Sequence, residues 1–419
     1  MTPRTWAATA VTATTGLALL AAAGCDSPNA AGATRTAAVV EDSAGVAVVT
    51  VPHEATAELP TWTVADEPTL TIGRLDGEPA YLFGSIGPAV LLPSGGVAVA
   101  DAQANEVRVF DAGGVWRRTL GREGDGPLEF AQVGGLWLGD DDRLAAVDTR
   151  HRKVVEFDLA SDTAEARSTG SELCPAAARP FTCRVAGVLA NGDFVVSHAV
   201  GPAEPSASEP GLNERPGDRV AMAVVRGETR LELGEASGAS FSVWSYDDGW
   251  IWFFETPFRP GETLATGHDR VAKAAPAARE IRIWSAAGVL ERVVRLHLEA
   301  PLPRSRLIDR MHAWADTGSS PYPVADYLDA ARFDEVVPAF STVHFDSESR
   351  LWVQPYTVSE ELGPVPDLPW LVLDREGLPL AWARGLPGDD LLDVGSDGVL
   401  VRSESVAGAP QVRLLPIRR

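Results

Sequence analysis

The sequence predicts an all-β fold, a six-bladed β-propeller, from three observations. Short turn signals recur six times, and each precedes a run of β-forming residues. A second strand-like element follows several of these runs. Matching positions in the first two repeats lie 47 residues apart, as for Asp101 and Asp148 or Phe110 and Phe157, a spacing within the range of four-stranded propeller blades.

The six turn signals are rich in Asp, Asn, Gly and Ser, residues that suit tight hairpins because Asn, Asp and Gly tolerate positive φ angles. Each is expected to join two antiparallel strands of one blade. The fourth is expected to lead into the strand Trp250–Phe254 of the fourth blade. The signals are Ser94–Gly96, Asp140–Asp142, Asn191–Asp193, Asp247–Gly249, Asp346–Ser349 and Ser396–Gly398.

A third strand is expected downstream in four of the repeats. These runs mostly alternate apolar and polar residues and end at turn residues, as β-strands with one buried face do. They are Val107–Asp111, Val154–Asp158, Ile281–Ser285 and Leu371–Asp374.

Residues 301–338 interrupt the β-pattern between the fourth and fifth blades and are expected to form a helical insertion. Two sets of residues there recur at helical spacing. We interpret both sets as packing residues rather than ligand contacts. They are Leu307, Met311 and Trp314, and Tyr327, Leu328 and Ala331.

Ring closure is indicated by a junction that occurs twice. The stretch 72–83 echoes 120–130, which leaves the outer strand of one blade and enters the next. Thr69–Ile72 should therefore be the outer strand of the last blade, which has room for only three strands after about Leu391. The pattern does not place Val46–Val51.

The junction Gly124–Phe130 resembles the blade junction of the bacterial six-bladed β-propeller family related to NHL repeats. Leu128 stands where that family has glycine, and Asp125 replaces a glutamate. The resemblance is strong in the first two blades and loose from 200 to 340. It implies an exported propeller, here a lipoprotein member, and no particular reaction.

The N-terminus is typical of an export signal. Residues 1–24 carry one charge, Arg4, followed by an apolar run that ends in small residues before Cys25. This resembles a bacterial lipobox, so we expect cleavage before Cys25 and lipidation of that residue. An uncleaved membrane anchor is the alternative. Residues 25–40 would then be a flexible tether, and 41–419 the propeller, held on the extracytoplasmic side, in the periplasm or at the cell surface.

Lipidation of Cys25 leaves an even pair, Cys174 and Cys183. In an oxidising compartment we expect a disulfide between them. Two buried free thiols are the alternative.

The charge balance argues against nucleic acid as a partner. The chain carries a net charge of −22, which repels phosphate backbones. Its lysines are Lys153 and Lys273 only, which leaves few places for lysine chemistry.

Known catalytic motifs are missing from the sequence, including the nucleophile elbow, the P-loop, the dinucleotide fingerprint and the EF-hand. The seven histidines are scattered without metal-ligand spacing. Asp101 and Asp148 could contribute oxygens to a Ca²⁺ ring near the axis, but two positions do not make a site. We therefore assign no catalytic and no metal-binding residue, and the sequence leaves the ligand-binding residues unknown.

The leading hypothesis is a non-enzymatic binding or display module of the cell envelope, with a protein, peptide or glycan as ligand. The alternative is a Ca²⁺-dependent hydrolase or lactonase, with Ca²⁺ as its cofactor; the chain's four asparagines weigh against it. A structural scaffold is a third hypothesis.

Overall fold

The computed structural model describes the chain from residue 37 onward with several gaps, and places it in one compact unit, Thr36–Arg419. The predicted leader and Cys25 lie outside the described residues. Within the described part, no helix combines the length and apolar character needed to span a membrane. The described residues are 37–140, 142–161, 163–168, 173–175, 182–201, 211–215, 217–245, 251–300, 302–317, 324–331, 333–358, 368–386 and 391–419.

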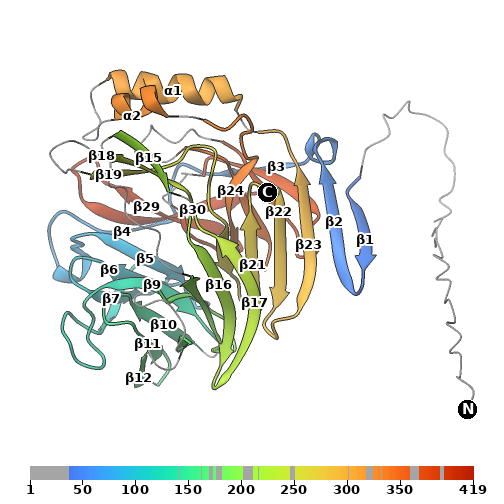
Figure 1. Cartoon of the computed structure of the whole chain (residues 1–419). Helices are drawn as coiled ribbons and strands as arrows, with labels where there is room; N and C mark the ends of the chain where they lie inside the picture. The colour runs from blue at the N-terminus through green and yellow to red at the C-terminus, as the bar shows by residue number, and fades with distance from the viewer. Residues whose placement is uncertain are drawn as a thin grey trace, which may run out of the picture. The chain divides into compact units, whose positions relative to one another are not determined.

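Blades 1 to 3 are four-stranded antiparallel sheets (Figure 1). Blade 1 consists of β5 (Ile86–Leu91), β6 (Val97–Asp101), β7 (Glu106–Phe110) and β8 (Trp116–Leu120). Blade 2 consists of β9 (Val133–Leu138), β10 (Arg143–Asp148), β11 (Lys153–Asp158) and β12 (Thr163–Ser168). Blade 3 consists of β13 (Arg184–Val188), β14 (Phe194–Val200), β16 (Arg219–Arg226) and β17 (Thr229–Ser237).

Blades 4 to 6 follow the same plan. Blade 4 consists of β20 (Thr263–Thr266), β21 (Arg270–Ala275), β22 (Glu280–Ser285) and β23 (Leu290–His297). Blade 5 consists of β24 (Phe340–Phe345), β25 (Leu351–Pro355), β26 (Trp370–Leu373) and β27 (Pro379–Arg384). Blade 6 takes β28 (Leu391–Val394), β29 (Gly398–Glu404) and β30 (Pro410–Arg418) from the C-terminal part of the chain.

The N-terminal segment supplies outer strands to blades 4, 5 and 6. The hairpin of β1 (Val39–Ser43) and β2 (Val46–Pro52) adds to blade 4, where β2 pairs in parallel with β23. After the short 3₁₀ helix η1 (His53–Thr56), β3 (Thr61–Val64) pairs in parallel with β27. Finally β4 (Leu70–Ile72) pairs with β30 and completes blade 6. The predicted closure by Thr69–Ile72 is confirmed, and Val46–Val51 receives its place in blade 4.

Contacts between the first strands of neighbouring blades close the ring. These strands touch in the order β28, β5, β9, β13, β20 and β24. The N–H of Ser347, just after β24, donates to the carbonyl of Val394 at the end of β28, at 3.0 Å. The structure therefore has six blades, as predicted.

Six hydrophobic clusters fill the six spaces between adjacent blades. The strand β6 shows why its sequence is uniformly apolar. Val97 and Val99 face blade 6, whereas Ala98 and Ala100 face blade 2. Because both faces of a blade are covered by its neighbours, its inner strands need apolar residues at successive positions.

The predicted helical insertion is present as α1 (Arg304–Asp316) and α2 (Val324–Ala330), between blades 4 and 5. Both helices pack on a separate three-stranded sheet, β15 (Gly211–Arg215), β18 (Phe241–Ser245) and β19 (Ile251–Glu255) (Figure 1). Leu307, Met311 and Tyr327 are buried in this contact, in agreement with a packing role.

The fourth turn signal was wrongly assigned to a blade. Asp247–Gly249 lies outside the described residues, but the strands that flank it, β18 and β19, pair with each other and with β15. The equivalent turn of blade 4 joins β20 and β21 at Gly267–Asp269. A hairpin pattern of this kind does not specify which sheet it joins, because that depends on long-range packing.

Cys174 and Cys183 form a disulfide. It lies on the connection from β12 of blade 2 to β13 of blade 3, and Cys183 stands directly before β13. The disulfide therefore restrains the segment that leads into the first strand of blade 3.

We expect Ile72→Ala to destabilise the ring at its closure. Ile72 is 1% exposed, pairs with Val412 and packs between blades 6 and 1, so the truncation should cost about 2 to 4 kcal/mol. Urea unfolding would measure this change. Thr71→Ala, at the exposed neighbouring position of β4, should change stability by less than about 0.5 kcal/mol; equal effects of the two variants would contradict the role of Ile72.

A second prediction concerns His344 in β24, which is half-buried and whose ring lies 5.6 Å from that of Trp370. Burial lowers the pKa of His344 to about 4, whereas an unfolded histidine titrates near 6.5. The unfolded state therefore binds more protons between these values, and stability falls as the pH falls from about 6.5 to 4, by up to about 3 kcal/mol.

Urea unfolding from pH 7 to pH 4 should show a smaller loss of stability in His344→Asn than in the wild type. His297→Asn, at an exposed position of β23, is the matched control. The same change of pH dependence in both variants would contradict the assignment to His344.

Candidate functional site

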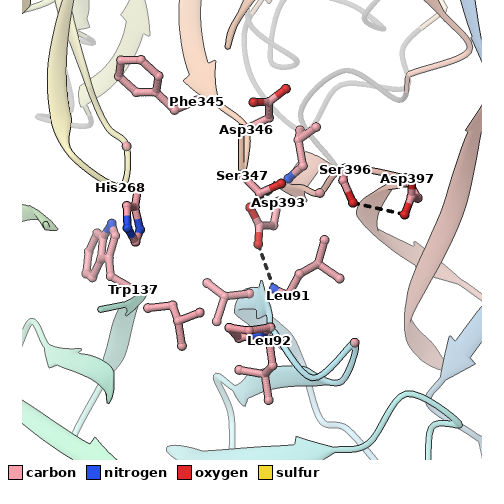
Figure 2. Close-up of a pocket in the computed structure, with 18 of the residues that line it drawn as sticks. Leu91, Leu92, Trp137, His268, Phe345, Asp346, Ser347, Asp393, Ser396 and Asp397 are labelled. Atoms are coloured by element: carbon pink, nitrogen blue, oxygen red, sulfur yellow. Dashed lines mark hydrogen bonds between the residues drawn. The ribbon is translucent and has the colours of Figure 1, made fainter. Parts of the chain in front are cut away.

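A cavity of about 1010 Å³ opens at one end of the propeller ring (Figure 2). All six blades contribute to its wall, mainly through the turns between their first and second strands. The helical insertion lies at the other end of β24, because this strand begins after α2 and ends at Phe345 in the cavity wall. The wall residues include Leu91 and Leu92, Trp137 to Asp140 and Asp142, Val188, Thr266 to His268, Phe345 to Ser347, and Asp393 to Gly398.

Hydrogen bonds between the turns hold this wall in place. The N–H of Asp140 donates to the carbonyl of Ala190 at 2.6 Å, and the N–H of Ala190 donates to the carbonyl of His268 at 2.8 Å. These bonds join blades 2, 3 and 4. Ser347 links blade 5 to blade 6 in the same way. The turns of blades 2, 3 and 4 are therefore linked to one another, and the turn of blade 5 is linked to blade 6.

Asp346 is a structural member of the wall. Its carboxylate accepts the N–H groups of Glu348 and Arg350, both at 2.9 Å, and the Trp352 indole N–H at 2.8 Å. The Arg350 guanidinium completes the set at 2.6 Å. Asp346 is only 3% exposed. Its oxygens are therefore engaged in shaping the turn of blade 5.

Asp393 joins blade 6 to blade 1 at the cavity. One carboxylate oxygen accepts the Leu91 N–H and the other accepts the Val394 N–H, both at 2.8 Å (Figure 2). Burial raises the pKa of Asp393, the two N–H donors oppose this, and the negative charge of Asp346 raises the pKa further. A carboxylate in this position has a cost for stability that an apolar side chain would not have.

The rest of the wall combines further polar groups with apolar surface. His268 Nε2 lies 3.3 Å from Asp140 Oδ1, linking blades 4 and 2. The Ser396 hydroxyl donates to Asp397 at 3.1 Å. Trp137 and Phe345 add aromatic surface. Figure 2 shows Trp137 and His268 on the side of the cavity away from Ser396 and Asp397.

Asp101 and Asp148, the residues considered for a Ca²⁺ ring, do not line this cavity. Asp101 accepts the N–H groups of Gln103 and Ala104 and an N–H of the Arg108 guanidinium. Asp148 repeats the pattern with Arg150 and His151. Both carboxylates are buried and stabilise the turn between the second and third strands of their blades. Among the residues that the structure describes, no group of three or more His, Cys, Asp or Glu side chains could hold a metal ion.

The junction that carried the family resemblance is likewise structural. Glu129 accepts the Gly126 N–H at 2.9 Å and pairs with Arg122 at 2.6 Å, and these contacts lower the pKa of Glu129. Phe130 is fully buried between blades 1 and 2. Gly121 has a φ of 68°, and a Cβ there would come within 2.3 Å of the Phe130 ring. The glycine is therefore required for this close approach.

The sequence did not identify Asp393, His268 or Trp137 as members of one site. A signal was present, because four of the six turn signals supply cavity residues, namely Ser94–Gly96, Asp140–Asp142, Asp346–Ser349 and Ser396–Gly398. Equivalent turns of a closed propeller meet at one end of its axis, so the repeated turns could have been expected to share a cavity.

Comparison with known proteins supports the fold. A family model described as a 6-bladed beta-propeller, DUF5128, matches residues 80–174, which include blades 1 and 2. No curated protein matches the chain.

Two solved structures from Bacteroides are similar to most of the chain. A duf4221 family member from Bacteroides vulgatus is 10% identical and covers 86% of this chain and 100% of its own, with a TM-score of 0.44. A protein from Bacteroides fragilis is 12% identical and covers 86% and 99%, with a TM-score of 0.43.

A gluconolactonase from Xanthomonas campestris is also similar, at 12% identity, with coverage of 85% and 100% and a TM-score of 0.36. The six closed blades and the match of blades 1 and 2 to the family model show that the chain is a six-bladed β-propeller.

Proposed function

We propose that this propeller is a non-enzymatic binding module of the bacterial cell envelope, anchored by lipid at Cys25, which takes a protein segment, peptide or glycan into its axial cavity. The observation that carries this proposal is the cavity itself. It has about 1010 Å³, at the upper end of the range of known ligand sites.

The character of the cavity wall supports binding. Ligand sites are mostly apolar and contain a few placed polar groups. Here Leu92, Val188 and Phe345 supply apolar surface, while Asp393 and Asp397 supply acceptors. The hydrogen bonds between the turns hold the wall before any ligand arrives, which lowers the entropic cost of binding.

The extracytoplasmic location follows from the signal-like N-terminus and agrees with the disulfide between Cys174 and Cys183. Nucleic acid is not proposed as a partner because of the net charge of −22. The membrane contact is assigned to the lipid at Cys25 alone.

Cys25→Ala should abolish anchoring without harming the propeller, because Cys25 precedes the compact unit that starts at Thr36. In a bacterial expression host, metabolic labelling with palmitate should be lost, and the protein should move from the membrane to the soluble fraction. Cys174→Ala and Cys183→Ala together serve as the control, since they also remove thiols but should keep the label. Labelling of Cys25→Ala at the wild-type level would contradict lipidation there.

Ser396→Trp should block the cavity, because Ser396 is exposed in its wall. Residues 26–419 would be incubated with an envelope extract, and retained molecules detected by native mass spectrometry. We expect the wild type to retain a ligand and Ser396→Trp to lose it. Ser161→Trp, an exposed turn position outside the cavity wall, should retain it.

Retention by all three proteins, or by none, would contradict binding in the cavity. Turnover of simple lactones by the wild type, dependent on Ca²⁺ and lost on chelation, would overturn the non-enzymatic proposal in favour of the hydrolase. A calorimetric Ca²⁺ titration with a thermal melt before and after chelation measures the cofactor directly.

A further inference from the structure

The geometry of the axial cavity points to a ligand that presents an ammonium or guanidinium group on an apolar stem, such as a lysine or arginine side chain of a peptide. We infer that Asp393 and Asp397 bind this cation. The inference rests on the proposed binding function and specifies the chemical class of its ligand.

The charges of the wall are unbalanced. Among the residues that the structure describes, five aspartates line the cavity, and the basic residue of its wall is His268. Asp346 forms an ion pair with Arg350, and Asp140 lies beside His268. The other three, Asp142, Asp393 and Asp397, have no basic side chain within 4.0 Å among the described residues. A cationic group would therefore gain attraction in a partly enclosed site, where solvent screens it less than at a surface.

Asp393 is oriented for this role. The Leu91 and Val394 N–H groups each occupy one of its oxygens, and a carboxylate oxygen can accept a second hydrogen bond. Both contacts come from the backbone, so the carboxylate is held without a competing positive charge. Asp346 lacks this capacity because four donors already surround it.

The apolar part of the wall complements the acidic part. Trp137, His268 and Phe345 lie on the side of the cavity away from Asp397 in the view of Figure 2. Aromatic faces attract ammonium and guanidinium groups, and lysine and arginine stems pack on apolar surface while the charged head reaches polar groups. An anionic ligand would find no arginine or lysine in the described wall.

The test is a calorimetric titration of residues 26–419 with acetyl-Ala-Arg-Ala-amide. Its citrulline analogue has nearly the same shape without the charge, and spermidine is a cation without a peptide. We expect the arginine peptide to bind at least about tenfold more tightly than the citrulline analogue. Added salt should weaken the binding of the arginine peptide but not that of the citrulline analogue. Tighter binding of spermidine than of the arginine peptide would identify a free organic amine as the source of the cation.

Asp393→Asn and Asp397→Asn should each weaken the binding of the arginine peptide about tenfold and leave the affinity for the citrulline analogue unchanged. Asp76→Asn, at an exposed position outside the cavity wall, is the matched control and should bind as the wild type does. A thermal melt of every variant checks folding. Asp393→Asn can unfold because one backbone N–H loses its acceptor. In that case Asp397→Asn, at the exposed rim, still tests whether the wall carboxylates bind the cation.

Equal binding of the arginine and citrulline peptides, unchanged affinity in Asp397→Asn, or no binding of any cation would overturn the inference. If the envelope ligand is still retained by the wild type and lost by Ser396→Trp in that case, the binding function stands and only the charge of its ligand is wrong. If the arginine peptide shows no preference and the wild type also retains no envelope ligand, the binding function is overturned as well.

Discussion

The structure depends on the burial of both faces of every blade against its neighbours. Each of the six apolar clusters is shared by two adjacent blades, so the described core residues of each blade are buried against its neighbours. A four-stranded sheet with two apolar faces would be unstable and prone to associate if either face were open. The ring must therefore close, and the packing of blade 6 against blade 1 is as necessary for stability as the contacts between the other blades.

Closure explains the path of the N-terminal segment. Blade 6 has three strands from the C-terminal part of the chain, and β4 from the N-terminal part completes it, pairing Ile72 with Val412. On the way, β2 and β3 extend blades 4 and 5 in parallel pairing. The segment thus covers the outer edges of three consecutive blades. Unpaired edges attract other strands, so this arrangement protects blades 5 and 6 and leaves β1 as the outer edge of blade 4.

The same closure produces the cavity. The first strands of six blades cannot meet on the axis itself, and their turns surround a space that side chains only partly fill. Hydrogen bonds join several of these turns, and the polar groups collected there include Asp393, whose pKa is raised by burial.

Local sequence patterns determined much of this architecture. The turn residues at Ser94–Gly96 and Ser396–Gly398, the apolar run Val97–Ala100 and the helical spacing of Leu307 and Met311 each predict an element from interactions between residues near in sequence. These elements appear in the structure where they were expected. The repeated junction even predicted that Thr69–Ile72 would complete the last blade.

Only the tertiary structure decided which elements come together. The hairpin of β18 and β19 has the turn and the alternation of a blade hairpin, yet it pairs with β15 and packs on α1 and α2. Asp148 and Asp393 are both aspartates at strand ends, but one caps a turn and the other lines the cavity. Strand pairing and side-chain environment depend on contacts between residues up to several hundred positions apart, such as Leu91 with Asp393, and no local pattern contains that information.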